Sequence, residues 1–376
     1  MHVQQFQYYR KNGWSEPLPL NADVDLVLVF GDKKLVKADS HNQVICKSFP
    51  NAVLASVSTA GEIHDSQAYE HTLSVTAITF EKTSVTGVQV DLNNYTSSFN
   101  AGQDLAQSLN QKELSHVLLF SDGIVTNGSD LIQGLESVLL DHITISGGLA
   151  GDGASFNETI VGLNGNNHSN QAVIIGFYGP FIQINHAAQS GWIPLGPRKK
   201  ITLSTKNTVY EFDHKPAIDF YKSYLNEQAK ELPSSGLLFP LKVYTSNSTA
   251  VIRTVVGVDT HNQSLVFAGN MPEGSFTQIM HATADDLLTG ALQAAEALAK
   301  HSPDLVIMVS CVARKLLLDD QITDEVHDVY TCLNHSAYSM AGFYSYGQIN
   351  PGHLNQQNKK SHLHNQTLTL IAIRES

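Results

Sequence analysis

The sequence predicts an α/β protein built from two related α/β lobes, in which layered, mainly buried sheets are flanked by helices. Short apolar segments rich in β-branched residues recur along the chain, and segments with apolar residues at helical spacing separate them. This alternation favours α/β layers over an all-α or all-β fold. Residues 57–63 (VSTAGEI) resemble residues 344–349 (YSYGQI), which suggests lobes descended from one unit.

The first half of the chain alternates strand-like and helix-like segments. Residues 24–30 (VDLVLVF) form a continuous apolar run that suits a buried strand. A helix is expected at Ser129, a good N-cap for a run with apolar residues at helical spacing. The other segments are expected to be strands at residues 54–57, 73–80, 85–90, 117–120 and 172–177, and a helix at residues 101–109.

The segment 191–200 (GWIPLGPRKK) predicts the boundary between the lobes, because its prolines, glycines and basic cluster interrupt the alternation. Domains of residues 1–195 and 196–376 are therefore expected. Thr283 and Asp286 resemble a capping box, so a helix is expected to follow them. The remaining segments are expected to be helices at residues 216–228 and 324–332 and strands at residues 237–243, 251–258, 305–309 and 367–373.

The composition excludes several classes of protein. A net charge of −12 over 376 residues gives no general attraction for nucleic acid or anionic lipid. No apolar run approaches the ~20 residues of a membrane span, and the N-terminus lacks the apolar core of a secretory signal, so a cytoplasmic protein is expected. The three cysteines form no CxxC pair and are expected to be reduced.

The glycine-rich stretch 147–159 (GGLAGDGASFNET) has two interpretations. It is either a turn in which Asp152 bonds its own backbone, or a pocket wall made of exposed backbone N–H groups. It lacks the Lys and Ser/Thr of a phosphate loop, and no G-x-G-x-x-G opens a helix here. In the second interpretation the ligand-binding candidates are Gly148, Gly151, Asp152, Gly153 and Asn157, with Arg314 available for a carboxylate.

Two groups near the C-terminus could hold a cofactor. His362 and His364 would face the same side of a strand, and one neutral imidazole suffices as a proximal ligand of haem iron. The alternative is that His364 and Asn365 are hydrogen-bonded polar residues at the mouth of a strand. The nearby rings of Phe343, Tyr344 and Tyr346 could line an apolar cofactor pocket or belong to the core.

Several segments together resemble the FIST family over nearly the whole chain, in the family's order and spacing. They are residues 58–63, Ser121-Asp122-Gly123, Asn127-Gly128-Ser129, GGLAGDG, GWIPLGP with Arg198, Leu237-Leu238-Phe239-Pro240-Leu241, Met271-Pro272-Glu273-Gly274, Ser310-Cys311 with Arg314, Gly342-Phe343-Tyr344-Ser345-Tyr346-Gly347 and Leu363-His364-Asn365-Gln366-Thr367. Two positions depart from the family, which often has Cys at Val57 and Glu at Gln348.

The resemblance implies an intracellular, mostly bacterial ligand sensor in signal transduction, similar to the bacterial nitric-oxide-sensing proteins (NosP). Such a protein would bind haem b, regulate a partner histidine kinase or cyclic-di-GMP enzyme, and have no enzymatic activity of its own. His364 is the first candidate for the iron ligand, and His362 and His335 are the others. The rings of Phe343 and its neighbours would pack against the porphyrin.

Two alternatives remain open from the sequence. The first is a haem-free sensor of a small metabolite such as an amino acid, which would use the glycine-rich stretch and Arg314. The second is an enzyme with Cys311 as nucleophile, because a strand-end cysteine close to an arginine can have a lowered pKa. A homodimer is possible in each case.

Overall fold

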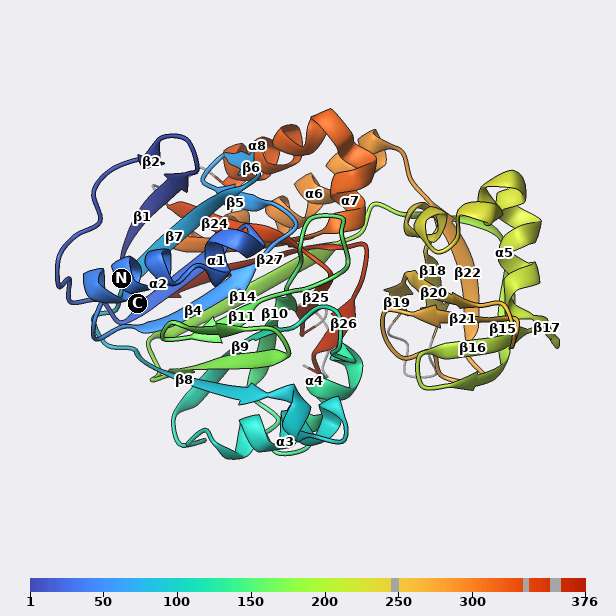
Figure 1. Cartoon of the computed structure of the whole chain (residues 1–376), viewed down its shortest axis with the longest axis horizontal. Helices are drawn as coiled ribbons and strands as arrows, with labels where there is room; N and C mark the ends of the chain where they lie inside the picture. Colours follow the sequence, from blue (N-terminus) through green and yellow to red (C-terminus); the bar gives the residue numbers. More distant parts are fainter. Residues whose placement is uncertain (245–249, 334–337, 352–359) are drawn as a thin grey trace.

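The computed structural model describes residues 1–244, 250–333, 338–351 and 360–376. Figure 1 shows a larger body and a smaller lobe joined side by side. The predicted α/β class, with several buried sheets flanked by helices, is confirmed. The body holds the N-terminal half of the chain together with its last segments, and the lobe runs from β15 to β22 (Figure 1).

Three sheets build the body. The first has the order β12-β11-β4-β3-β7-β1-β2, with bounds Asn166–His168, Val161–Leu163, Val53–Ser58, Leu26–Gly31, Thr72–Thr79, His2–Tyr9 and Gly13–Trp14. The second has the order β26-β25-β10-β9-β13-β8, with bounds His362–His364, Gly347–Asn350, Thr144–Leu149, Leu114–Ser121, Gln171–Tyr178 and Ser84–Asp91. The third has the order β14-β27-β23-β24-β5-β6, with bounds Ile182–Gln189, Leu368–Glu375, Leu305–Cys311, Ser339–Ser345, Glu62–His64 and Gln67–Tyr69.

The three sheets pack on one shared apolar core. The rings of Phe30, Phe120 and Phe343 meet there, one from each sheet, with centroids 4.8 to 6.0 Å apart. The sequences of the core strands are continuous apolar runs because both faces of these strands are buried. The helices of the body are α1 (Lys33–Lys37), α2 (Asp39–Ser48), α3 (Ser98–Gln107), α4 (Gly128–Glu136), α6 (Ala284–Leu298), α7 (Val312–Leu318) and α8 (Ile322–Leu333).

The body repeats one unit three times. In each unit two parallel strands lie beside a third, antiparallel strand, as in β3, β4 and β7 of the first unit. The same arrangement recurs in β9, β10 and β13 and in β23, β24 and β27. A hairpin strand from each unit (β5, β11 or β25) then extends the sheet of another unit.

Equivalent backbone contacts support the repeat. The N–H groups of Asp32, Asp122 and Cys311 donate to the carbonyls of Thr72, Gln171 and Thr367 over 2.8 to 3.1 Å. The residue before each of these carbonyls has a positive φ, and these residues are His71, Asn170 and Gln366. The two matching segments of the sequence occupy equivalent places in the first and third units, and the second unit has little sequence in common with either.

The chain closes on itself between the first and third units. Strands β8 and β14 each leave their own unit and join the next sheet, and β1 takes the corresponding place beside β7. The two termini lie together (Figure 1), and the Met1 amino group is 3.5 Å from the carboxylate of Glu375. Strand β1 thus takes, beside β7, the place that β8 takes beside β13 and β14 takes beside β27.

The lobe has its own sheet and its own core. Its sheet has the order β19-β18-β22-β15-β16-β21-β20, with β17 beside β16, and the bounds are Ala250–Arg253, Leu241–Tyr244, Phe276–His281, Ile193–Thr205, Thr208–Phe212, Ser264–Phe267, Val255–Asp259 and Lys215–Pro216. Helix α5 (Ala217–Leu225) packs on this sheet. The boundary expected at residue 195 falls within β15, and α6 returns the chain to the body (Figure 1).

Several element boundaries differ from those predicted; the strand expected at residues 237–243, for example, begins only at Leu241 as β18, after the 3₁₀ helix Ser234–Leu238. Helix α4 is capped by Asn127, whose carboxamide accepts from the N–H groups of Ser129 and Asp130, so the expected cap lies inside the helix. The single strand expected at residues 251–258 is two strands, β19 and β20, which pair with different neighbours. The capping box at Thr283 and Asp286 is confirmed.

Candidate functional site

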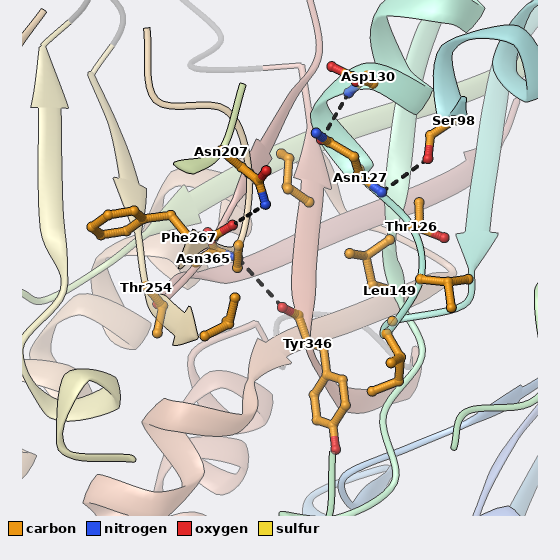
Figure 2. Close-up of a pocket in the computed structure, with 18 of the residues that line it drawn as sticks. Ser98, Thr126, Asn127, Asp130, Leu149, Asn207, Thr254, Phe267, Tyr346 and Asn365 are labelled. Carbon is orange, nitrogen blue, oxygen red and sulfur yellow. Dashed lines mark hydrogen bonds between the residues drawn. The ribbon is translucent and has the colours of Figure 1, made fainter. Parts of the chain in front are cut away.

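A pocket of about 750 Å³ lies between the body and the lobe (Figure 2). The body lines it with the segment that leads into α3, with residues 123–128 after β9, and with the strand-end residues Leu149, Cys311 and Leu363. The lobe contributes residues of β20 and β21 and the turn that holds Lys206 and Asn207. Its size falls within the range of ~300–1,000 Å³ that is usual for small-molecule sites.

The repeat explains why the body is open at this place. In the first unit Lys33, the first residue of α1, reaches Asp152 over 3.0 Å. In the third unit Lys315 of α7 pairs with Glu70 and donates to the carbonyl of Ala60 over 2.6 Å. In the second unit residues 122–127 (DGIVTN) separate β9 from α4 and include no lysine. This strand end therefore stays open, in line with ligand binding at the carboxyl ends of strands in α/β proteins.

The pocket floor contains an unsatisfied carboxamide. Asn365 is 1 % exposed, and its Nδ2 group donates weakly to the carbonyl of Tyr346 over 3.5 Å. Its Oδ1 atom is buried and has no hydrogen-bond partner among the described residues. The next residue, Gln366, is anchored differently, because its Nε2 group donates to the Leu237 carbonyl and to the Thr254 hydroxyl. A buried acceptor without a partner costs about 1–3 kcal/mol, which a ligand that donates to it would recover.

The pocket is close to neutral. Of its described lining residues only Asp130 and Lys206 carry a formal charge at neutral pH, and their charged atoms are 3.9 Å apart across the two lobes. The N-termini of α3 and α4 open on the same space, near Ser98 and Asn127 (Figure 2), and add a weak positive potential. Hydroxyl and amide groups supply the rest of its polar surface.

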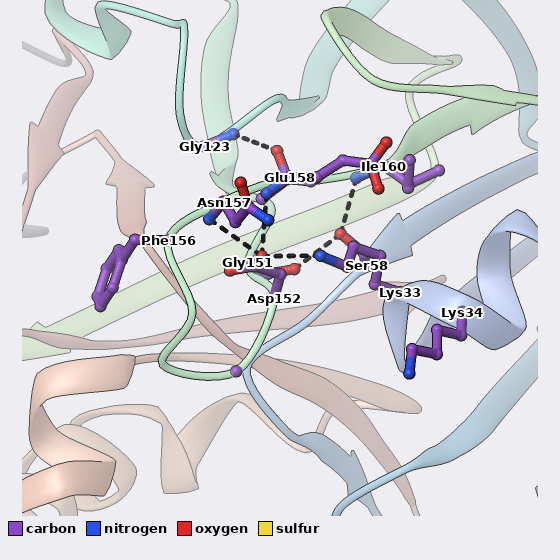
Figure 3. A network of polar contacts seen from close by, with 12 residues as sticks. Lys33, Lys34, Ser58, Gly123, Gly151, Asp152, Phe156, Asn157, Glu158 and Ile160 are labelled. Carbon is purple, nitrogen blue, oxygen red and sulfur yellow. Dashed lines mark hydrogen bonds and ion pairs between the residues drawn. The ribbon is translucent and has the colours of Figure 1, made fainter.

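One wall of the pocket is an aromatic pair held by the glycine-rich stretch. Phe156 stacks on Tyr346 with ring centroids 4.5 Å apart. Burial raises the pKa of the Tyr346 phenol, and the hydrogen bond that its hydroxyl donates to Asp152 raises it further. Asp152 also accepts from the N–H groups of Asn157 and Glu158 and pairs with Lys33 (Figure 3). Burial alone would raise the pKa of Asp152, but these hydrogen bonds hold it below its usual value.

The glycine-rich candidates lie behind this wall. The N–H groups of Gly151 and Gly153 donate to the Ser58 and Thr59 carbonyls over 2.9 and 3.1 Å, so both are used within the protein. Gly148 lies in β10, where an added Cβ would be 2.8 Å from the Val309 side chain. The stretch thus forms a turn in which the Asp152 carboxylate accepts from the backbone N–H groups of Asn157 and Glu158, which is close to the first of the two interpretations. The pocket is lined by Leu149 and Phe156 of this stretch, and by none of its five candidates.

Arg314 belongs to a buried ion pair. Its guanidinium donates to Glu325 over 2.5 and 2.9 Å and to the Ser190 and Leu287 carbonyls. Both side chains are 0 % exposed, so Arg314 fixes α8 and α6 to the end of β23 and does not reach the pocket. Cys311 does line the pocket, and burial raises the pKa of its thiol, which disfavours the thiolate that a nucleophile needs.

The residues expected to hold haem are not brought together. Phe343 and Tyr344 are 0 % exposed, the first in the shared core and the second bonded to Glu325 over 3.1 Å. On β26 the rings of His362 and His364 are 6.3 Å apart, and the residue between them, not either histidine, lines the pocket. His335 lies outside the described residues. Of the described members of the expected set, only Tyr346 lines the pocket.

The described pocket residues do not fit a haem held by histidine, because they include no histidine. Within the described ranges there is also no cluster of three or more His, Cys, Asp or Glu side chains able to hold a metal ion. Nor does any helix in those ranges have the length and apolar character needed to cross a membrane.

A two-lobed α/β fold with a pocket between the lobes is the architecture of a protein that binds small ligands. Residues 25–215 match the model of the FIST N domain, and residues 217–351 match that of the FIST C domain. The chain belongs to the FIST family, whose domains are sensors of small ligands in signalling proteins. No curated protein matches the chain.

Sequence reasoning missed Asn365 as a site residue, although it stands in the LHNQT segment that carries the resemblance. A polar residue inside a family segment was the available signal. Asn207 gave no such signal, because it reaches the pocket only through the packing of the lobe on the body.

Proposed function

We propose that this protein is a sensor that binds a small organic metabolite in the pocket between its lobes. The observation that carries the proposal is the buried acceptor of Asn365 at the floor of a pocket lined by both lobes. A ligand that donates to Asn365 and contacts the lobe would stabilise one relative position of the two lobes. That differential stabilisation is what a sensor needs in order to report binding.

A small set of polar contacts joins the lobes beside the pocket. The guanidinium of Arg253, at the end of β19, donates to the Leu363 carbonyl over 2.7 Å and to the Ser129 hydroxyl over 3.3 Å. Burial lowers the pKa of Arg253 to about 10, and no carboxylate of the described chain pairs with it. The Asn270 carboxamide also bonds Asp130 over 2.7 Å and accepts from Asn127.

The rival proposal is a haem-based nitric oxide sensor that regulates a histidine kinase or a cyclic-di-GMP protein. It has less support, because the described pocket offers Tyr346 but no histidine. The two proposals also predict different visible absorption spectra. Haem gives the purified protein a Soret band, whereas a metabolite sensor is colourless.

The test begins with protein purified from cells, which is denatured so that released compounds can be identified by mass spectrometry. Each compound is added back to ligand-free protein, and thermal stabilisation is measured. Ala268→Trp, which fills the pocket from the lobe, should abolish the stabilisation, whereas Thr260→Trp on an exposed turn of the same lobe should keep it. Refutation would come from stabilisation that A268W leaves intact, or from a Soret band that responds to nitric oxide.

A further inference from the structure

We infer that the ligand is an uncharged molecule that carries a carboxamide-type edge, with an N–H and a C=O side by side, next to an apolar group. This inference rests on the proposed function and specifies the chemistry of its ligand. Primary amides, lactams and short peptides with blocked ends have such an edge. Free amino acids, whose carboxylate and ammonium groups are both charged, do not.

The carboxamide of Asn365 defines the edge. An asparagine side chain has one acceptor oxygen and two N–H donors. In this protein one N–H of Asn365 is directed to the Tyr346 carbonyl, so one N–H and the whole Oδ1 atom are left without partners among the described residues. A donor and an acceptor fixed on one planar group pair best with a planar group that offers an acceptor and a donor. This is the complementarity by which an asparagine side chain reads the edge of a base.

The neighbours of Asn365 hold this group in place. Its own backbone N–H donates to the Ile252 carbonyl over 3.4 Å, and the following residue bridges to Leu237 and Thr254 of the lobe. The residue as a whole is 1 % exposed, so its free positions lie out of reach of bulk water. A partner that satisfied only one of the two free positions would leave the other buried and unpaired.

The charge of the pocket selects against ions. The two charged side chains of its described lining, Asp130 and Lys206, already neutralise each other across the lobes. A phosphate or a dicarboxylate would meet one partly exposed lysine and no arginine among the described lining residues. A cation would meet one aspartate that Asn270 already bonds over 2.7 Å. The pocket therefore favours a ligand without net charge.

The apolar walls of the pocket favour a ligand that carries an apolar group. Leu149, Val312 and Leu363 line the body side, and Val255 and Phe267 line the lobe side. The stacked rings of Phe156 and Tyr346 close one end. A volume of about 750 Å³ takes a drug-sized molecule and greatly exceeds the needs of a single amino acid.

The experiment uses the full chain and a panel in which each of several apolar groups carries, in turn, a primary amide, an N,N-dimethylamide, a methyl ester, a carboxylate or an amine. Binding is measured by calorimetry to the wild type, to Asn365→Leu and to Asn365→Asp. Thr260→Ala, on an exposed turn of the lobe outside the pocket, serves as the control. The thermal unfolding of each ligand-free variant shows whether it is folded.

We expect the primary amides to bind at least ~10-fold more tightly than the matched esters and dimethylamides, which keep the carbonyl acceptor but lack the N–H that would pair with Oδ1 of Asn365. N365L should remove this preference. N365D replaces the free N–H by a second acceptor, so it should favour amines over amides. The T260A control should keep the order of the wild type.

Two results would overturn the inference and leave the sensor proposal standing. One is a wild-type protein that binds the esters or acids as tightly as the amides. The other is an amide preference that persists in folded N365L. A wild type that binds no compound of the panel and no compound released from the cells would overturn both the inference and the proposed function.

Discussion

Glu62 and Gln348 form a natural comparison inside one chain, and it predicts the effect of Glu62→Gln. The two residues take equivalent places in the first and third units. Glu62 accepts from the N–H and hydroxyl of Thr72 over 3.1 and 2.8 Å, and Gln348 accepts from the same groups of Thr367 over 3.3 and 3.1 Å. Gln348 also donates to the Ser345 hydroxyl over 2.6 Å. A glutamine at position 62 should therefore fit with the Thr59 hydroxyl in that role.

The increase in the free energy of unfolding that E62Q produces should depend on pH. Burial is the largest cause that raises the pKa of Glu62, from its ordinary value of 4.5 to about 7. A raised pKa in the folded state means that the protonated form adds stability below pH 4.5, and that this stability is lost as the pH rises to about 7. At about 1.4 kcal/mol per pKa unit the loss is about 3 kcal/mol. E62Q is neutral throughout, so it should avoid the loss.

The assay is chemical denaturation of both proteins between pH 5 and pH 8.5. E62Q should match the wild type at pH 5 within about 1 kcal/mol and exceed it by about 2–3 kcal/mol at pH 8. Gln348→Glu is the reciprocal variant and should be less stable than the wild type at pH 8. The reasoning is refuted if the difference between wild type and E62Q stays constant over this pH range.

Three further predictions concern the pocket wall, the contact between the lobes and acid stability. Tyr346→Phe removes the hydroxyl that holds Asp152, so the free energy of unfolding should fall by about 1–3 kcal/mol and ligand binding should weaken, both measured by denaturation with and without ligand. Arg253→Met removes the donors that join the lobes, and limited proteolysis at the exposed start of β15 should become several-fold faster, whereas the surface change Lys242→Met should leave it unaltered. Burial lowers the pKa of His186 to about 3. On acidification the unfolded chain therefore takes up a proton at this histidine before the folded protein does, and the free energy of unfolding falls as the pH drops below 6.5. His186→Phe should remove about 2 kcal/mol of that loss at pH 5, and an unchanged dependence of stability on pH would contradict this.

The fold class followed from local patterns, because buried strands such as residues 24–30 must be apolar on both faces. The threefold repeat did not, since its shared features are mostly backbone hydrogen bonds and positive φ angles that His, Asn and Gln can all adopt. The side chains preserve the repeat in the short similarity between residues 57–63 and 344–349, where Glu62 and Gln348 make equivalent hydrogen bonds.

The site was harder to predict than the fold. The composition of the glycine-rich stretch suggested a binding role, but its glycines allow close packing of the backbone. From this stretch Phe156 and Leu149 line the pocket. The histidines of β26 were chosen by strand periodicity, which places them on one side but does not say which side faces the pocket. Leu363, between them, faces it.

The position of the lobe in the chain explains why the protein has this pocket. Strand β8 leads through α3 to β9, and β14 leads through α6 to β23, so the two connections are equivalent. The lobe is inserted into the second connection, between β14 and α6, and it packs over the open end of the second unit. The other two strand ends are bridged by Lys33 and Lys315. Insertion of a lobe at one of three similar ends therefore forms a pocket with walls from the body and the lobe, beside which Arg253 donates from the lobe to Leu363 and Ser129 of the body.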